Sequence, residues 1–268
     1  MCVDSNQSSP TVSHVIPKGR EVGGVTSLGD HVFVVRSRSQ QKIEVYDANT
    51  FSLQRHIKVP GIDDNTWGLA ACANNNCLYA SNYNNHNVHR VDLSGSNAVT
   101  MWYVALGPLG LSVNSEHNLL VVSQLARKLQ IFTTHGTVLQ EIQLREDTDY
   151  IRHAVQLSTG LVGVDGAVVR SYGGQQGSQL TQMNAPRGLA VDREGRVLVA
   201  DWDNNRLLVI DQSLSSAHEM SVSVDGGLER PYRLWYDQLR RRLYIGESGG
   251  RVIIIDNLED FTASEVNA

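Results

Sequence analysis

Short apolar runs separated by polar turns are clearest between residues 186 and 211. The three runs read GLAV, RVLVA and RLLVI, and the two turns between them read DREG and WDNN. Apolar runs of this length, bounded by Gly, Asp and Asn, are typical of strands joined by tight turns. The pattern therefore predicts an antiparallel meander. A single meander cannot bury both of its faces, so it needs further copies of itself to pack against.

The start of this meander recurs along the chain. The position of Gly188, or its equivalent, falls at residues 24, 68, 110, 153, 188 and 233. Consecutive copies are therefore 35 to 45 residues apart, and there are six of them. Repeats of this length indicate a solenoid, a propeller or a similar array.

Most copies contain three further runs after the first. The second run is represented by His31–Val35 and the third by Arg206–Asp211, and both are largely apolar. The fourth run, for example Val138–Leu144, alternates apolar with polar residues, as an outer strand with one solvated face should. Four antiparallel strands per repeat, with the inner ones apolar, predict the blade of a β-propeller.

The two ends of the chain predict how the ring closes. The last repeat ends near residue 258 without a fourth strand, whereas the run at residues 11–16 precedes the first repeat and belongs to no other. We expect this run to complete the last blade as its outer strand, which removes an exposed sheet edge. The predicted domain spans residues 11–258, between flexible tails at 1–10 and 259–268. The predicted blades cover residues 22–62, 64–105, 108–147, 150–178, 182–226 and 228–258, the last completed by residues 11–16.

The fourth repeat is too short for a complete blade. Only 12 positions separate His153 from Asp165, whereas 23 separate Gly188 from Asp211. Residues 156–165 have room for one strand and a turn. We expect either a three-stranded blade or a blade that has lost part of its sequence, and in both cases the weakest sector of the ring.

Composition and charge narrow the class of protein. Of the 268 residues, 41% are hydrophobic and 19% charged, which is ordinary for a globular domain with a sizeable core. The formal net charge of −5 excludes a chain that binds polyanions through its overall charge, so RNA binding would need one local basic face. Cys2, Cys72 and Cys77 are too few for a disulfide framework or a paired-cysteine zinc site, and reduced thiols are expected.

Neither a signal sequence nor a membrane span is predicted. The N-terminal segment lacks a basic stretch followed by an apolar one, and no apolar run approaches the roughly 18 residues that a span needs. We therefore expect a cytoplasmic chain that contacts no membrane, and a propeller that is monomeric by itself.

The fifth copy resembles the NHL repeat. It carries PRGLAVD at residues 186–192, then GRVLVAD at 195–201, then NNR at 204–206 and a closing Ile-Asp. The array of copies resembles the TolB-like NHL propellers of tripartite-motif and related RING-type ubiquitin ligases. The resemblance covers residues 11–258, is strong in the fifth repeat and is weak in the fourth. It implies an all-β, six-bladed propeller of four-stranded antiparallel blades, with the fourth blade truncated and the ring closed by the N-terminal strand.

The resemblance implies an interaction module. In tripartite-motif proteins a RING domain recruits the ubiquitin-conjugating enzyme, and the propeller selects protein or single-stranded RNA ligands. This chain has three cysteines, whereas a RING needs about eight Cys and His ligands for two zinc ions. We therefore expect no catalytic residue, no cofactor and no metal here, and a role in substrate recognition within a ubiquitin-ligase system.

The candidate binding face surrounds the mouth of the central channel. In a propeller the loops between second and third strands gather there with the segments that lead into the first strands. In this chain they carry arginines interleaved with aromatic side chains, which suit stacking on single-stranded nucleic acid and equally suit a protein hot spot. The candidate ligand-binding residues are Arg36, Arg38, Trp67, Tyr83, His86, Arg127, Tyr150, Arg152, Arg187, Trp202, Arg206, Tyr232 and Arg233.

Other roles for these residues stay open. Arg187 and Arg206 also suit ion pairs with Asp201 or Asp203 of the same blade, and Trp67 suits the core. The same face carries acidic residues that would repel phosphates unless they lie apart from the arginines: Asp63, Asp64, Glu146, Asp147, Asp149, Asp201 and Asp203. These residues and the negative net charge favour a protein or peptide ligand, with single-stranded RNA as the alternative and DNA not expected.

A third alternative is an enzyme, because six-bladed propellers also include calcium-dependent lactonases and amidating lyases. Such sites need carboxylates, amides or histidines that converge on the channel. The candidates are Glu21, Asn82, Asp201 and Glu247, although Asn and Asp at such positions also suit hydrogen bonds to the adjacent hairpin turn. His86, His89 and His153 lack a recognisable metal-ligand spacing.

Overall fold

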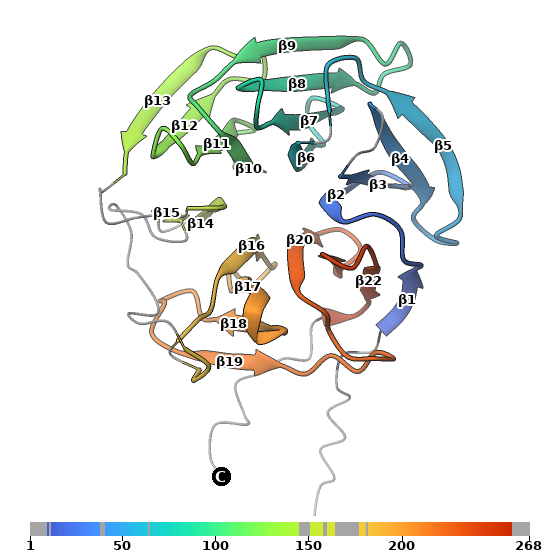
Figure 1. Cartoon of the computed structure of the whole chain (residues 1–268), viewed down its shortest axis with the longest axis vertical. Coiled ribbons are helices and arrows are strands. Elements are labelled where there is room, and N and C mark those ends of the chain that lie inside the picture. The colour runs from blue at the N-terminus through green and yellow to red at the C-terminus, as the bar shows by residue number, and fades with distance from the viewer. Residues whose placement is uncertain are drawn as a thin grey trace, which may run out of the picture.

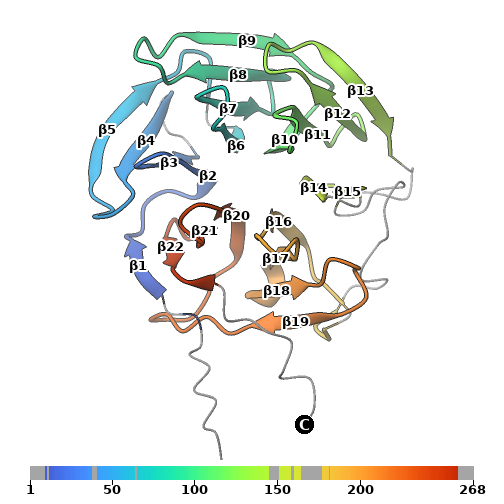
Figure 2. The same ribbon diagram turned by 180° about the vertical axis from the view of Figure 1, so that it is seen from behind.

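In a computed structural model, the β-sheets of the chain are arranged in a ring around a central channel (Figure 1). Figure 2 shows the same ring from behind. The structure describes residues 10, 12–37, 41–63, 65–144, 151–157, 160–163, 177–180 and 182–258, with the backbone alone at 160–163. Both predicted tails therefore lie almost wholly outside the described residues. The all-β propeller predicted from the sequence is confirmed.

Five antiparallel four-stranded blades run from an inner strand beside the channel to an outer strand at the rim, and we number them by sequence repeat. The first blade contains β2 (Val22–Leu28), β3 (His31–Arg36), β4 (Lys42–Asp47) and β5 (Leu53–Lys58). The second contains β6 (Thr66–Cys72), β7 (Cys77–Asn82), β8 (Asn87–Asp92) and β9 (Val99–Tyr103). The third contains β10 (Pro108–Val113), β11 (Leu119–Ser123), β12 (Lys128–Phe132) and β13 (Val138–Gln143). The fifth contains β16 (Pro186–Val191), β17 (Val197–Asp201), β18 (Arg206–Ile210) and β19 (Ala217–Met220), with the short 3-10 helix η1 (Trp202–Asn204) after β17.

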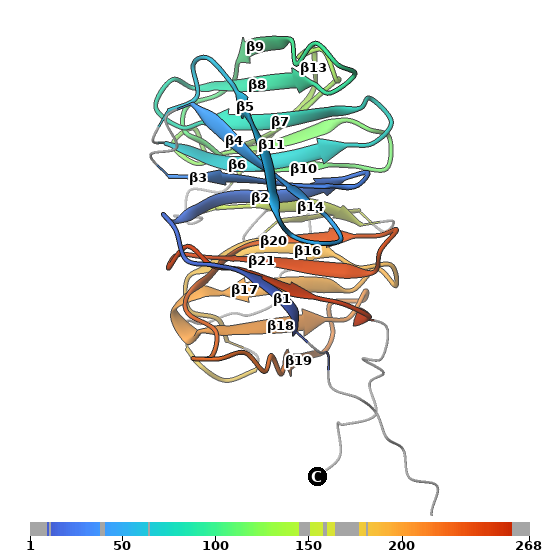
Figure 3. The ribbon, with the colours of Figure 1, turned by 90° about the vertical axis from the view of Figure 1, so that its right-hand side faces the viewer.

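The last blade joins the two ends of the chain. It contains β20 (Pro231–Asp237), β21 (Arg242–Glu247), β22 (Val252–Ile255) and, at the rim, β1 (Val12–Ile16). β1 pairs antiparallel with β22, from Val12 opposite Ile255 to Ile16 opposite Val252. Figure 3 shows β1 lying against the red strands of this blade. The predicted closure by the N-terminal strand is thus confirmed.

The predicted count of six blades is wrong, because the fourth repeat does not form a four-stranded blade in the described residues. In the part of the chain that the structure describes, five sheets have four strands, and the fourth sector holds only the hairpin of β14 (Ala154–Leu157) and β15 (Gly160–Gly163). The shortness of this repeat is the reason, because the residues after His153 suffice for two short strands. The remainder of the predicted blade, at 164–176, lies outside the described residues.

His153 joins this sector to both neighbours. Its Nδ1 accepts a hydrogen bond of 2.9 Å from the Leu189 backbone N–H in β16, so Nε2 carries the proton and donates to the Leu111 carbonyl of β10, also at 2.9 Å. Burial lowers the pKa of His153 to about 4, which keeps the ring neutral. A side chain therefore supplies cross-blade hydrogen bonds on both sides of the smallest sheet.

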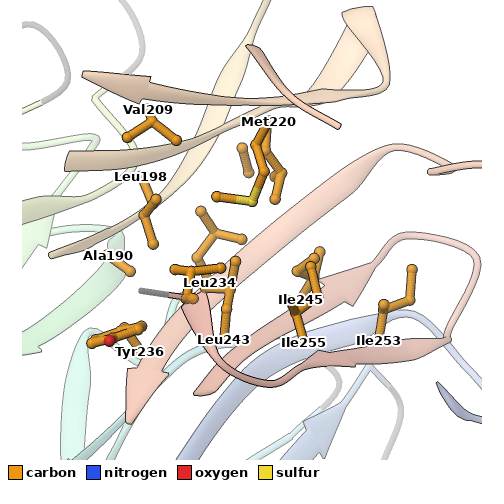
Figure 4. Close-up of a cluster of buried hydrophobic side chains, with 13 residues drawn as sticks. Ala190, Leu198, Val209, Met220, Leu234, Tyr236, Leu243, Ile245, Ile253 and Ile255 are labelled. Carbon is orange, nitrogen blue, oxygen red and sulfur yellow. The ribbon is translucent and has the colours of Figure 1, made fainter. Parts of the chain in front are cut away.

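The hydrophobic core is divided among the interfaces between neighbouring blades. One cluster joins the fifth blade to the last and includes Leu198, Val209, Leu234 and Ile245 (Figure 4). The clusters on either side of β14 contain fewer described residues than the others. Outer strands such as β5 and β13 are largely exposed, as their mixed composition predicts. The ring is thus held by apolar contacts between sheets, which no single blade could make alone.

Two smaller expectations can also be compared with the structure. Cys72 and Cys77 lie opposite each other across the β6–β7 hairpin; both are free, as expected, and both are buried. No helix in the described residues is long and apolar enough to span a membrane.

Candidate ligand-binding face at the channel mouth

The inner strands β6, β16 and β20 each contain a register shift, or β-bulge, near their first residue. In β16 the partners change from Pro186–Asp201 to Gly188–Ala200, which leaves Arg187 as an extra residue. The same shift leaves Trp67 extra in β6 and Tyr232 extra in β20. Bulges of this kind re-aim side chains and are frequent beside functional sites. Three of the predicted site residues are therefore placed by one repeated backbone feature.

These side chains form a continuous cluster of arginines and aromatic rings. The Arg187 guanidinium carbon lies 4.6 Å from the centre of the Trp202 ring and 6.0 Å from that of Tyr232. Arg230 lies 4.8 Å from the Trp202 ring, and Arg233 lies 4.3 Å from the Tyr232 ring. The Tyr232 ring meets that of Trp67 edge to face at 6.1 Å. We call this set the mouth cluster: Trp67, Arg187, Trp202, Arg230, Tyr232 and Arg233.

Other contacts hold the cluster in position. Trp202 donates from Nε1 to the Ser248 hydroxyl at 2.8 Å, which ties the fifth blade to the last. Arg233 is buried and donates from Nε to the Gly23 carbonyl at 2.8 Å, so it reaches across to the first blade. The side chains of the cluster are therefore ordered before any ligand arrives.

Positive charges crowd the mouth. Burial lowers the pKa of Arg233, and repulsion from Arg187 lowers it further. The pKa of Arg152 is lowered in the same way, by burial first and then by Arg187. Glu21 is the opposing charge near Arg187 and Arg233, yet burial raises the pKa of its carboxyl group. Among the described residues, Arg152, Arg187 and Arg233 therefore lie close enough together to repel one another.

Two of the predicted arginines serve the fold. Arg36 donates from Nε to Glu44 at 2.8 Å and from Nη1 to the carbonyls of Arg20 and Gly250, so it fastens the chain that follows the closing strand. Arg206 pairs with Asp201 at 2.8 Å, which is the alternative that the sequence left open. Both guanidinium groups are buried in these contacts, so neither presents a free surface to a ligand.

The other predicted residues lie in loops of the second and third blades, lie just before β14, or fall outside the described residues. Tyr83 and His86 belong to the β7–β8 turn, where His86 Nδ1 accepts a hydrogen bond from Gly107 N–H. Arg127 lies in the equivalent β11–β12 turn, and Arg152 is near the cluster. Arg38 and Tyr150 lie outside the described residues. That these residues bind a ligand stays a prediction.

Arg230 is a cluster member that sequence reasoning missed. It directly precedes Pro231 and has a positive φ of 49°, a conformation that non-glycine residues rarely adopt outside turns. Its backbone N–H donates to Asn205 Oδ1 in the neighbouring blade. The position before the proline of the repeat was the available signal, but its contact with Trp202 depends on two blades meeting.

The side chains considered for catalysis contact the adjacent turns. Asn82 donates to the Gly61 carbonyl and accepts from Asn85 N–H, and Asp201 accepts from Asn184 N–H and Arg206. Glu247 pairs with Arg251. Within the described residues, no group of three or more His, Cys, Asp or Glu side chains is arranged to hold a metal ion. The hydrogen-bonding role that Asn and Asp often have in hairpins is therefore the one observed.

The central channel contains a cavity of about 380 Å³ behind the mouth. Its walls are mainly apolar, with Leu69, Leu111 and Leu189 among them, and Arg233 also lines it. The channel extends to the opposite face of the ring, where Leu239 and Arg240 line it. Arg233 is thus a residue that both the mouth cluster and the channel share.

Comparisons with known proteins support the fold. The sequence model of the NHL repeat matches residues 183–210, which span β16 to β18. No curated protein matches the sequence. The chain is similar to virginiamycin B lyase from Staphylococcus aureus, solved as an inactive variant with quinupristin, with a TM-score of 0.65, 12% identity, and coverage of 90% of this chain and 82% of that one.

Two further solved structures have comparable similarity. Hydrazine synthase from Kuenenia stuttgartiensis has a TM-score of 0.61 and 11% identity, with coverage of 96% of this chain and 99% of that one. The β-propeller domain of Cps50 (Swd1) from Myceliophteria thermophila has a TM-score of 0.64 and 12% identity, with coverage of 92% and 99%. At such low identities these likenesses concern the fold alone.

Proposed function

We propose that this chain is a non-catalytic recognition module that binds a protein or a peptide at its channel-mouth face. The observation that carries the proposal is the mouth cluster, in which the half-exposed side chains of Trp67, Arg187 and Trp202 are held by ring and cation–π contacts. Tryptophan, tyrosine and arginine dominate the hot spots of protein interfaces. Side chains that are already ordered also lose little entropy on binding.

A non-catalytic role accords with the partners of the polar residues at the channel. Asn82, Asp201 and Glu247 hydrogen-bond nearby turns and arginines, which leaves them poorly placed for proton transfer or metal binding. Under this proposal, calcium or zinc at low concentration leaves the melting temperature unchanged. A rise in melting temperature that is lost in Asp201→Ala would instead support a metal-dependent enzyme.

We further propose that the module works in the cytoplasm as the substrate-recognition part of a ubiquitin-ligase system. The NHL repeat at residues 183–210 and the resemblance of the repeat array to the propellers of tripartite-motif proteins support this context. Ligase activity would then belong to a RING domain on the same or another polypeptide.

A quantitative pull-down tests the recognition function. The immobilised chain is compared with Trp67→Ala and Arg187→Ala, and with the control Leu239→Ser, which changes a side chain that is 87% exposed at the opposite end of the channel. We expect a set of bound proteins that both mouth variants lose and the control retains. Equal recovery by all four proteins would contradict the proposal.

Single-stranded RNA is the second candidate ligand, because arginines alternating with aromatic rings also suit nucleotide stacking. Treating the lysate with ribonuclease before the pull-down separates the two candidates. Direct protein recognition predicts unchanged recovery. If the bound proteins disappear with the RNA, and a labelled oligouridylate binds with an affinity that falls steeply with salt, RNA is the ligand.

A further inference from the structure

The mouth cluster contains hydrogen-bond donors without acceptors. Arg187 Nε and Arg233 Nη2 are both buried, and neither has a hydrogen-bond partner within the described part of the chain. Arg233 is only 6% exposed, so its guanidinium group has lost most of its contact with solvent. A buried donor without an acceptor costs about 1–3 kcal/mol, and more when it is charged. The cluster is therefore incomplete as a hydrogen-bonding system.

The cluster is also short of negative charge. Arg187, Arg230 and Arg233 bring three guanidinium groups together, and Glu21 is the carboxylate that acts on two of them. Glu229 also acts on Arg230 but is paired with Lys18 at 3.0 Å, and Glu247 is paired with Arg251. An anion at the mouth would relieve the repulsion between the arginines and accept from the unpartnered donors.

The geometry favours a carboxylate. A planar guanidinium group donates two parallel hydrogen bonds to a carboxylate, and these charge-assisted pairs are about twice as strong as neutral ones. Aromatic faces hold Arg187 and Arg230 on Trp202, which leaves the edges of the two guanidinium groups to make such pairs. Neighbouring Trp67 is half-exposed and offers ring surface to an apolar side chain next to the acidic one, and the buried ring of Tyr232 packs against it edge to face.

The surroundings of the cluster argue against a polyanion. Exposed Asp203 adjoins Trp202, and Asp63 lies beside the β7–β8 turn, where Asn85 donates to it. A strand of RNA that crossed the mouth would bring successive phosphates toward these carboxylates. A peptide can instead place a single acidic side chain among the arginines and keep uncharged residues elsewhere.

We propose that the mouth cluster recognises an extended peptide through one Asp or Glu side chain, whose carboxylate binds Arg187 and the neighbouring arginines while an adjacent apolar side chain packs on the half-exposed ring of Trp67. The inference rests on the proposed recognition function and names the chemistry of its ligand. Arg187 is the central residue, because it contacts both ring systems of the cluster.

Selection from a random linear peptide display library on the full chain tests this inference. We expect the selected peptides to share an acidic residue next to an apolar one. A synthetic, fluorophore-labelled peptide from the selection should bind about 10- to 100-fold more weakly when that residue is changed from Asp to Asn or from Glu to Gln. Fluorescence polarisation provides the dissociation constants.

The protein variants complete a double-mutant cycle. Arg187→Ala should weaken binding of the acidic peptide by a similar factor, yet it should bind the amide peptide as the unchanged protein does. Arg240→Ala is the matched control, since it also removes one positive charge but lies at the opposite end of the channel, paired with Asp30. We expect it to leave the dissociation constant unchanged.

The outcomes separate the inference from the function on which it rests. Peptides that lack an acidic residue, or that bind Arg187→Ala normally but fail to bind Trp67→Ala, overturn the inference and leave peptide recognition standing. If no peptide is selected, the inference is overturned, and the pull-down with the mouth variants decides separately whether the recognition function stands.

Discussion

The fifth blade and the fourth sector are neighbours in the ring, but they are held in different ways. In the fifth blade, Arg206 pairs with Asp201 of the same sheet and donates to the carbonyls of Ser178, Gln179 and Gln182. Its polar contacts thus join β17 and β18 to the segment that leads into the blade. The described part of the fourth sector has two strands, and its polar contacts reach outward to other blades.

The polar contacts between the fourth sector and its neighbours are made on both sides of the sector. His153 of the fourth sector bonds the backbones of Leu111 and Leu189, and Ser112 of the third blade donates to the Ala154 carbonyl at 2.6 Å. The described hairpin of β14 and β15 is therefore held in place by partners on its neighbours. The comparison indicates that the described part of the fourth sector depends on a few specific side chains, whereas the fifth blade depends mainly on its own strands.

Removing the fifth-blade ion pair should have the largest effect on stability. Arg206→Ala leaves the fully buried Asp201 carboxylate without its cationic partner and frees three backbone carbonyls. Loss of one member of a buried pair costs about 3–5 kcal/mol. Urea unfolding measures the change, with Arg230→Ala as the control for loss of an exposed arginine. A loss below about 1 kcal/mol would contradict a structural role for Arg206.

Replacing His153 should have the second-largest effect and should act locally. His153→Ala leaves the Leu189 N–H and the Leu111 carbonyl unpartnered, at about 1–3 kcal/mol for each group. We expect amide hydrogen exchange to increase in β10, β14 and β16 and to stay slow in β21, which contacts none of these groups. Uniform acceleration over the whole ring would show that the fourth sector is no weaker than the rest.

Acid should weaken the contacts of His153 specifically. Its folded pKa of about 4 lies below the usual 6.5, so the unfolded chain binds the proton first as pH falls. Stability from this group is complete above the unfolded pKa and declines toward the folded one, by about 2 kcal/mol between pH 7 and pH 5. Burial also lowers the pKa of His89 and His218, which adds to the decline.

The variant His153→Gln isolates the histidine contribution to this pH dependence. Its urea midpoint should fall less between these pH values than that of the unchanged protein, because glutamine does not titrate. Identical pH profiles for the two proteins would rule out a depressed pKa at this position.

The smallest expected effect is at Ser112. Ser112→Ala removes its hydrogen bond to Ala154 and should cost about 1 kcal/mol, the net value of one neutral hydrogen bond. Thermal unfolding and hydrogen exchange at β14 measure the loss. An effect as large as that of His153→Ala would mean that the third blade, and not the histidine, chiefly holds this sector.

The mouth cluster shows which residues of the candidate site the sequence could predict and which it could not. Trp67, Arg187, Trp202 and Tyr232 were predicted to lie on the binding face, because the repeat fixes where loops and first strands meet. Arg206 was predicted there too, yet it is buried in its own blade. Arg230 was missed, since its contact with Trp202 joins residues of two blades. Sequence position indicated the face, but not which arginines remain available on it.

The sequence by itself determined the strands, the repeat, the propeller and the closure by β1, because alternation of apolar and polar residues is a local property that recurs in every copy. It could not determine the number of complete blades or the partners of the buried polar groups. The tertiary structure decided those, since His153 and Arg233 find hydrogen-bond partners on other blades and Arg206 finds them on the segment before its own blade. Hydrogen bonds between distant segments leave no periodic signal in the chain, and apolar burial does.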